Sequence, residues 1–208
     1  PPSPPPSGGV EGVTVISTDG VAGMTTVRLS ITLDATQSNV YAMAGTSETT
    51  MSFPPAYQAA APFGQDIGGV PPAFIAAAAD AEFDSWLTIG VTDGSAAGQL
   101  AASPGFDIAS LWTESTGLEE TNSAVFYMDP GTMGANSGSD PIVMAQMTLS
   151  ADDAASGSAT ARLQGRAVDS SQEDWTYSAT WTWSGSTEPP PPSPPPSGGV
   201  EGVTVIST

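Results

Sequence analysis

Residues 27–34 read Val-Arg-Leu-Ser-Ile-Thr-Leu-Asp and alternate apolar and polar side chains without a break. Successive side chains of a β-strand point to opposite faces of the sheet, so a period of two predicts a strand with one face in a core. The same alternation returns near the other end of the chain, at residues 143–149, 159–163 and 175–183. We expect the core to contain the apolar members of these runs: Val27, Leu29, Ile31, Leu33, Val143, Met147, Leu149 and Leu163.

Shorter strands are predicted between these runs, at residues 10–18, 39–45, 83–91 and 124–128. Clusters of Gly, Asp, Asn and Ser separate them, as expected for turns. One short helix is expected over residues 73–80, with proline at its first turn. Many short strands without helical periodicity predict an all-β fold, a jelly-roll-like β-sandwich.

The two ends of the sequence repeat one another. Residues 1–18 and residues 191–208 both read PPSPPPSGGVEGVTVIST, a match at every position. This identity predicts a tandem array, with one full period followed by the opening of the next, cut from a longer chain. The expected units are a linker at 1–9, a β-sandwich domain at 10–188, a second linker at 189–199 and the first strand of the next repeat at 200–208. A duplication of one end during cloning is the other interpretation.

The linker at 189–197 reads PPPPSPPPS and is followed by two glycines. Such runs adopt polyproline II, and at ~3.1 Å per residue nine residues make a stiff spacer of roughly 28 Å. These segments resemble the Ser-Pro-rich parts of hydroxyproline-rich glycoproteins of green algae, although a plain inter-domain spacer is the simpler interpretation. The resemblance implies O-linked glycans on the linker residues: Pro1, Pro2, Ser3, Pro4, Pro5, Pro6, Pro189, Pro190, Pro191, Pro192, Ser193, Pro194, Pro195 and Pro196.

A second resemblance lies in the middle of the domain. Residues 62–74 read PFGQDIGGVPPAF and residues 83–90 read FDSWLTIG. This Pro-Phe-Gly…Asp-Ser-Trp-x-Thr-Ile-Gly pattern resembles uncharacterised, tandem-repeated extracellular β-domains of algae and other aquatic microbes. The resemblance covers roughly residues 40–130. It implies a secreted, modular surface protein and assigns no reaction.

Charge and composition exclude several classes of function. The chain has 3 Lys+Arg against 22 Asp+Glu, a net charge of −19, and neither His nor Cys. Nucleic-acid binding, zinc fingers, thiolate metal sites, disulfides and His-based catalysis are therefore excluded. We expect neither membrane insertion nor enzymatic activity. Carboxylate pairs are the one catalytic option, but we expect these acidic residues on the solvated surface: Asp80, Glu82, Asp84, Glu114, Glu119 and Glu120.

Two further features are candidate binding sites. The Gly-rich loop 129–140 carries Asp129 and Asp140 at its ends, and such oxygen ligands suit Ca²⁺, although a solvated acidic hairpin loop is the other interpretation. No other cofactor is expected. Trp86 and Trp112 are candidates for stacking on a sugar, against the simpler expectation that both pack in a core beneath a loop.

The sequence as a whole predicts a structural repeat of an extracellular filament or surface appendage, glycosylated on its spacers, with neighbouring copies as partners. The alternative is a carbohydrate-binding or adhesion module displayed in tandem. Residues 10–18, with their copy at 200–208, are predicted to form a strand with apolar residues on both faces. This strand either opens its own domain or adds to the sheet of a neighbouring repeat, through Val13, Val15, Val203 and Val205.

Overall fold

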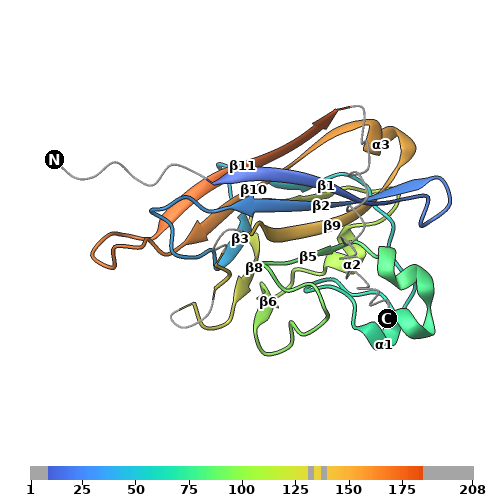
Figure 1. Cartoon of the computed structure of the whole chain (residues 1–208), viewed down its shortest axis with the longest axis horizontal. Coiled ribbons are helices and arrows are strands. Elements are labelled where there is room, and N and C mark those ends of the chain that lie inside the picture. Colours follow the sequence, from blue (N-terminus) through green and yellow to red (C-terminus); the bar gives the residue numbers. More distant parts are fainter. Residues whose placement is uncertain (1–8, 131–133, 137–139, 185–208) are drawn as a thin grey trace, which may run out of the picture.

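The computed structural model describes residues 9–130, 134–136 and 140–184, and it shows two antiparallel β-sheets packed in a sandwich (Figure 1). The all-β class and the β-sandwich are confirmed. The strands are β1 (Val10–Thr18), β2 (Met24–Thr32), β3 (Ala42–Gly45), β4 (Met51–Phe53), β5 (Trp86–Leu87), β6 (Leu100–Ala102), β7 (Leu118–Glu120), β8 (Ser123–Tyr127), β9 (Ile142–Ser150), β10 (Ser156–Gly165) and β11 (Trp175–Ser184). The helices are α1 (Pro72–Ala77), the 3₁₀-helix η1 (Ala79–Phe83), α2 (Ile108–Leu111) and α3 (Ala151–Ala155).

The first sheet has the order β1-β2-β9-β5, and the second has the order β6-β8-β3-β10-β4-β7, with β11 paired to β10. The main core lies between them and contains residues from both sheets. Seven of the eight side chains expected there are buried, and Leu33 has the largest exposed fraction of the seven, 9%. Period-two alternation therefore identified the inward faces of β2 and β10 correctly, and in β11 the apolar odd-numbered positions are likewise the buried or partly buried ones.

Val143 is the exception, and the reason is a β-bulge. Leu29 of β2 pairs with Ala145 of β9, but the next residue, Ser30, pairs with Val143, so Met144 is an extra residue in β9. The bulge turns Val143 to the outer face of the sheet, where it is only partly buried against Trp86 and its neighbours. The expectation that Val143 lies in the main core is wrong.

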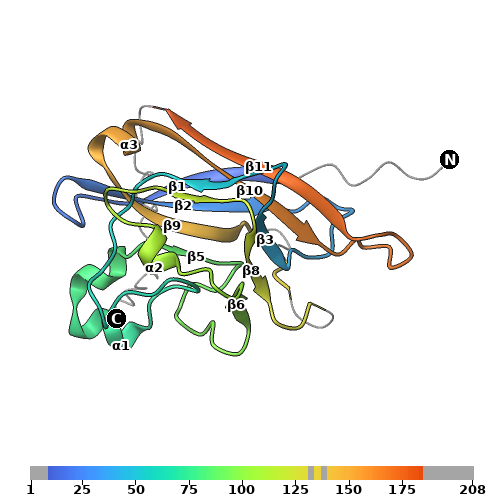
Figure 2. The same ribbon diagram turned by 180° about the vertical axis from the view of Figure 1, so that it is seen from behind.

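The outer face of the first sheet is also covered. The loop at residues 54–71, together with α1 and η1, packs on it and forms a second, smaller core that contains Trp86, Val70 and Ala81. Figure 2 shows these helices at one end of the sandwich, beside β5 and β9. Because β9 is covered on both sides, almost all of its residues are buried, including Gln146 and Thr148.

Local structure differs from expectation in the middle of the chain. The strand expected at 83–91 is reduced to the two residues of β5, because η1 extends to Phe83 and Gly90 has a positive φ of 81°. The expected helix at 73–80 is shorter, ending at Ala77, and has proline in its first turn as predicted. Strands β4, β6 and β7 were not predicted, since three residues are too few to show an alternation.

Candidate functional site

The end of β11 lies at the same end of the sandwich as the turn that joins β1 to β2. Thr18 ends β1 just before this turn, and Met24, which follows the turn, pairs with Ser150 at the start of α3. Strand β10 begins directly after α3, and its first residue, Ser156, pairs with Ser184, the last residue of β11. Helix α3 contacts both β2 and β11, which closes this end.

The other end of the sandwich holds the start of β1. Val10 pairs with Thr32, a full strand length away from the turn after Thr18. Strands β1 and β11 contact one another and run in the same direction, so the chain enters the described domain at one end and leaves it at the other. Figure 1 shows this arrangement, with β1 beginning on the left and the arrowhead of β11 on the right.

Both of these strands lie at the same edge of the sandwich, and Glu11 connects them. Within the described residues, β1 pairs with β2 alone and β11 with β10 alone. The carboxylate of Glu11 accepts hydrogen bonds from the hydroxyl of Tyr177 and, at 3.3 Å, from the backbone N–H of Thr180. Burial and the hydrogen bond to Glu11 raise the pKa of Tyr177 to about 12. Residues 166 positions apart in sequence carry no local signal, so this contact was not predicted.

The two faces of β1 differ. Val13 and Val15 are partly buried against the main core, whereas Thr14 and Ile16 are exposed. A second bulge, between Val15 and Ser17, leaves Ile16 without a residue opposite it and 45% exposed. The expectation of a strand covered on both faces is therefore wrong, because the face that carries Thr14 and Ile16 is exposed.

Backbone pairing also shows where this strand belongs. Strand β1 pairs with β2 of its own domain, so the structure shows the first of the two predicted arrangements and does not describe addition to a neighbouring repeat. Val203 and Val205 lie outside the described residues, as do all the linker prolines and serines for which glycans are predicted. Glycosylation and the conformation of the linkers stay predictions.

The calcium candidates Asp129 and Asp140 lie at the two ends of a partly described loop. Asp140 and Asn136 line a surface hollow of about 390 Å³, together with Thr92 and Tyr127, whereas Asp129 does not line it. Among residues 9–130, 134–136 and 140–184, no three acidic side chains come together in a group that could hold a metal ion. Calcium binding stays a prediction, with one carboxylate at the hollow.

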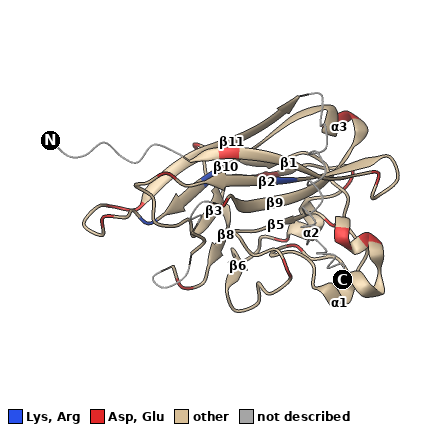
Figure 3. Ribbon diagram, viewed as in Figure 1, with Lys and Arg blue, Asp and Glu red and all other residues tan. Residues whose placement is uncertain are grey.

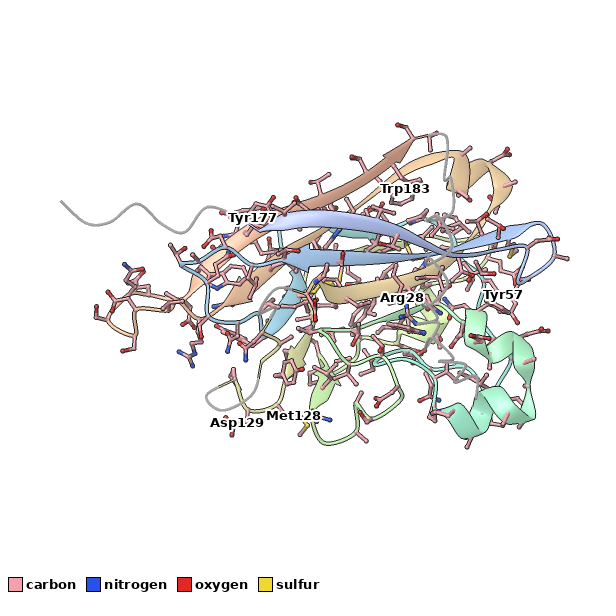
Figure 4. The ribbon with its side chains drawn as sticks, in the orientation of Figure 1. Arg28, Tyr57, Met128, Asp129, Tyr177 and Trp183 are labelled. Carbon is pink, nitrogen blue, oxygen red and sulfur yellow. The ribbon has the colours of Figure 1, made fainter. Side chains whose placement is uncertain are left out.

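The two tryptophans considered as sugar platforms are both buried. Trp86 is 1% exposed beneath the loop at 54–71, where the guanidinium of Arg28 lies 5.6 Å from its ring centroid (Figure 4 labels Arg28). Trp112 is fully buried, and its indole N–H donates to the carbonyl of Pro54. Core packing, the simpler expectation, is confirmed for both, since Trp86 lies in the smaller core and Trp112 in the main core, and neither ring offers a face for stacking.

The acidic residues expected on the solvated surface are placed there in part. Those that are exposed are Asp80, Glu82, Glu114 and Glu119, and Glu120 is partly buried. Asp84 is fully buried, so the expectation is wrong for this residue. The carboxylate of Asp84 accepts hydrogen bonds from the backbone N–H groups of Ala59, at 2.8 Å, and Gln65, at 2.6 Å. It thereby holds the loop at 54–71 against the sheet. Burial raises the pKa of Asp84 to about 6, although these N–H groups act in the opposite direction.

The raised pKa of Asp84 predicts a pH-dependent stability. The folded state favours the protonated carboxyl more than the unfolded state does, where the pKa is ~3.9. This contribution is therefore fully present below pH ~4 and is lost as the pH rises to about 6. We expect the stability of the natural chain relative to Asp84→Asn, measured by urea unfolding, to fall by a few kcal/mol across this interval.

Asp80→Asn, which removes an exposed carboxylate from the same segment, is the matched control for this measurement. The two N–H groups of the loop bond to different oxygens of Asp84, and asparagine has only one oxygen, so Asp84→Asn also changes stability by an amount that does not depend on pH. The test is therefore how the difference in the free energy of unfolding between the two chains changes with pH, and not the size of that difference at one pH. A difference that stays constant between pH 4 and pH 7 would contradict the role given to Asp84.

Comparisons with protein-family models, with curated proteins and with solved structures found no match to this chain. The resemblance to repeated extracellular domains therefore stays a prediction. In the described part of the chain, no helix combines the length and the apolar character needed to cross a membrane.

Proposed function

We propose that this chain is a structural repeat unit of an extracellular filament or surface appendage, glycosylated on its proline-rich spacers. The observation that carries the proposal is the position of the first residue of β1 and the last residue of β11. Because β1 begins at one end of the sandwich and β11 ends at the other, successive domains joined by spacers string out end to end. A domain whose ends lay together would hang to the side of the filament instead.

The internal repeat supports the same function. Strand β1 is the first strand of the domain, and residues 200–208 have the same sequence as β1. They therefore carry every side chain that the first strand of a further sandwich needs. A spacer, a first strand and a sandwich make one period, and the sequence begins the next period after 190 residues, since 191 − 1 = 190.

The surface of the domain suits a structural role. Acidic residues are spread over several loops and near α1 and α3 (Figure 3), and the exposed face of β11 consists of serine and threonine. All three cations are engaged: Arg28 lies over Trp86, while Arg162 and Arg166 hydrogen-bond to residues at or near β11. This supports neighbouring copies and glycans as partners rather than nucleic acid.

The proposal predicts a periodic object of known spacing. Ten residues of β11 span roughly 33 Å, and the spacer adds roughly 28 Å if it is extended. We therefore expect micrographs of native material to show an axial repeat on the order of 60 Å per domain. Glycopeptide mass spectrometry should show added sugar on residues 189–196, with the unmodified peptide of the same segment from bacterial expression as the control.

Two results would overturn the proposal: native material without axial order, or spacer peptides that have only their polypeptide mass. The rival function, a carbohydrate-binding module, predicts binding on a glycan array and no periodic order. No tryptophan face is available for it among the described residues, since all five indoles are at most 9% exposed.

A further inference from the structure

Tension along a filament of this kind would pass through each domain from its first strand to its last. The inference below rests on the proposed function, because it asks how the domain withstands the force that a filament transmits. Force applied at Val10 and Ser184 acts in opposite directions along the axes of β1 and β11, since these residues lie at opposite ends of the sandwich.

The pairing of β1 with β2 determines how this force acts on backbone hydrogen bonds. In an antiparallel pair these bonds are perpendicular to the strands, so a pull along the strand loads all of them together instead of opening them one after another. From Val10 to Val15 the strand keeps one continuous register with β2, up to the bulge at Ile16. Strand β11 is paired with β10 over its full length, from Trp175 to Ser184, and is loaded in the same way.

Side chains connect the two pulled strands to each other and to the opposite sheet. Glu11 of β1 accepts hydrogen bonds from Tyr177 and Thr180 of β11 near the entry end. The indole N–H of Trp181 donates to the carbonyl of Ser30 in β2 at 2.7 Å, so β11 is also bonded to the strand that holds β1. Nearer the exit end, the indole N–H of Trp183 donates to the carbonyl of Asp153 in α3 at 2.8 Å. Figure 4 shows Tyr177 and Trp183 at different positions along β11.

We propose that β1, clamped between β2 and the Glu11–Tyr177 contact, makes this domain a mechanical element that resists stretching between its two ends. The clamp consists of residues 10–15 with their partners on β2, and of Glu11 with Tyr177 and Thr180. Its rupture is the step that sets the unfolding force. A repeat unit of a filament does not need such a clamp to be joined to its neighbours. The proposal therefore adds a mechanical role to the proposed structural one.

The test is single-molecule force spectroscopy on the full chain in two pulling directions. In the first, marker domains at residues 1 and 208 pull β1 along its axis. In the second, the handles are at residue 1 and at Ala35→Cys, an exposed position just after β2, so that β1 is peeled from β2 one bond at a time. The chain has no cysteine of its own, so the attachment point is unique. We expect an unfolding force about twofold higher, or more, in the first direction.

The Glu11 contact is tested in the first direction with Tyr177→Phe, which removes the donor and keeps the ring. We expect a lower unfolding force than in the natural chain. Tyr57→Phe, the same substitution in the loop at 54–71, is the matched control and should leave the force unchanged. Glu11→Gln should independently lower the pKa of Tyr177 from about 12, read by ultraviolet titration as the difference from Tyr177→Phe.

Equal unfolding forces in the two pulling directions would contradict the proposal that β1 is a mechanical clamp. An unchanged unfolding force in Tyr177→Phe would show that the Glu11–Tyr177 contact does not contribute to the clamp. These measurements use the purified chain and do not depend on glycans or on assembly. A strong clamp in a protein whose native form has no axial order would therefore leave this inference standing and overturn the proposed function. Native material with axial order and a chain with equal unfolding forces in the two directions would support the proposed function and contradict the clamp.

Discussion

Replacing Trp181 by alanine is expected to lower the free energy of unfolding by about 3–5 kcal/mol. The side chain lies in β11 and is fully buried between the two sheets. Its removal leaves a cavity in the main core, and it also leaves the carbonyl of Ser30 without the indole N–H that it accepts from at 2.7 Å. Because a domain of this size is stable by only ~5–15 kcal/mol, this is a large part of the total.

The measurement is urea unfolding followed by circular dichroism, with Thr182→Ala as the matched control. Thr182 is the next residue of the same strand and is exposed, so its substitution is expected to change stability by less than about 1 kcal/mol. Trp181→Phe keeps most of the ring and loses the hydrogen bond, and should fall between the two. A cost for Trp181→Ala no larger than that for Thr182→Ala would show that the two sheets do not pack through this residue.

Replacing Gly69 by alanine is expected to cost about 2–4 kcal/mol. Gly69 has a φ of +80°, a conformation in which a β-carbon is strained, and an added β-carbon would lie 2.3 Å from the carbonyl oxygen of Thr92. Backbone atoms cannot move aside as a flexible side chain can. The loop at 54–71 would therefore have to shift away from the segment at Thr92, which would displace the neighbouring Val70 from its packing in the smaller core with Trp86.

Gly98→Ala separates the two causes of this cost. Gly98 has a φ of +78°, nearly the same, but no atom lies within 4 Å of the added β-carbon. It should therefore lose only the ~1–2 kcal/mol of the backbone strain. Urea unfolding of the two variants measures the difference, and the fluorescence of the buried indoles reports any loosening of the loop. Equal losses in the two variants would show that the close approach to Thr92 has no energetic consequence.

The sequence predicted the fold wherever local alternation is uninterrupted. In β2, β10 and β11 the apolar side chains at every second position are buried, except that of Tyr177, which is partly buried. The prediction failed at Val143, since the bulge at Met144 changes which face the next residue occupies, and apolar residues on both sides of the bulge hide it. The strand expected at 83–91 failed for a different reason. There the helix η1 extends to Phe83 and Gly90 has a positive φ, so only Trp86 and Leu87 pair as β5.

The candidate site was predicted only in part. The repetition of residues 1–18 drew attention to the segment that forms β1. The strand predicted at Val10–Thr18 is confirmed at both of its ends. Neither Glu11 nor Tyr177 was singled out. A single glutamate near the start of a strand and a tyrosine in an alternating strand are ordinary residues in the sequence. Only the fold places them side by side, 166 positions apart. The buried carboxyl of Asp84 was noted only as one of several clustered acidic residues.

The sequence by itself determined the all-β class and the repeat, and it excluded every chemistry that needs histidine, cysteine or lysine. These conclusions rest on composition, identity and short-range periodicity, which are properties of the chain before it folds. Only the tertiary structure decided that Trp86 and Trp112 are buried and that the loop at 54–71 is held by Asp84. It also decided that β1 and β11 run side by side with their free ends apart. The direction of each strand in the sandwich depends on which distant segments pair with one another. An alternating pattern of side chains is the same whichever way its strand runs, so the sequence could not show this arrangement.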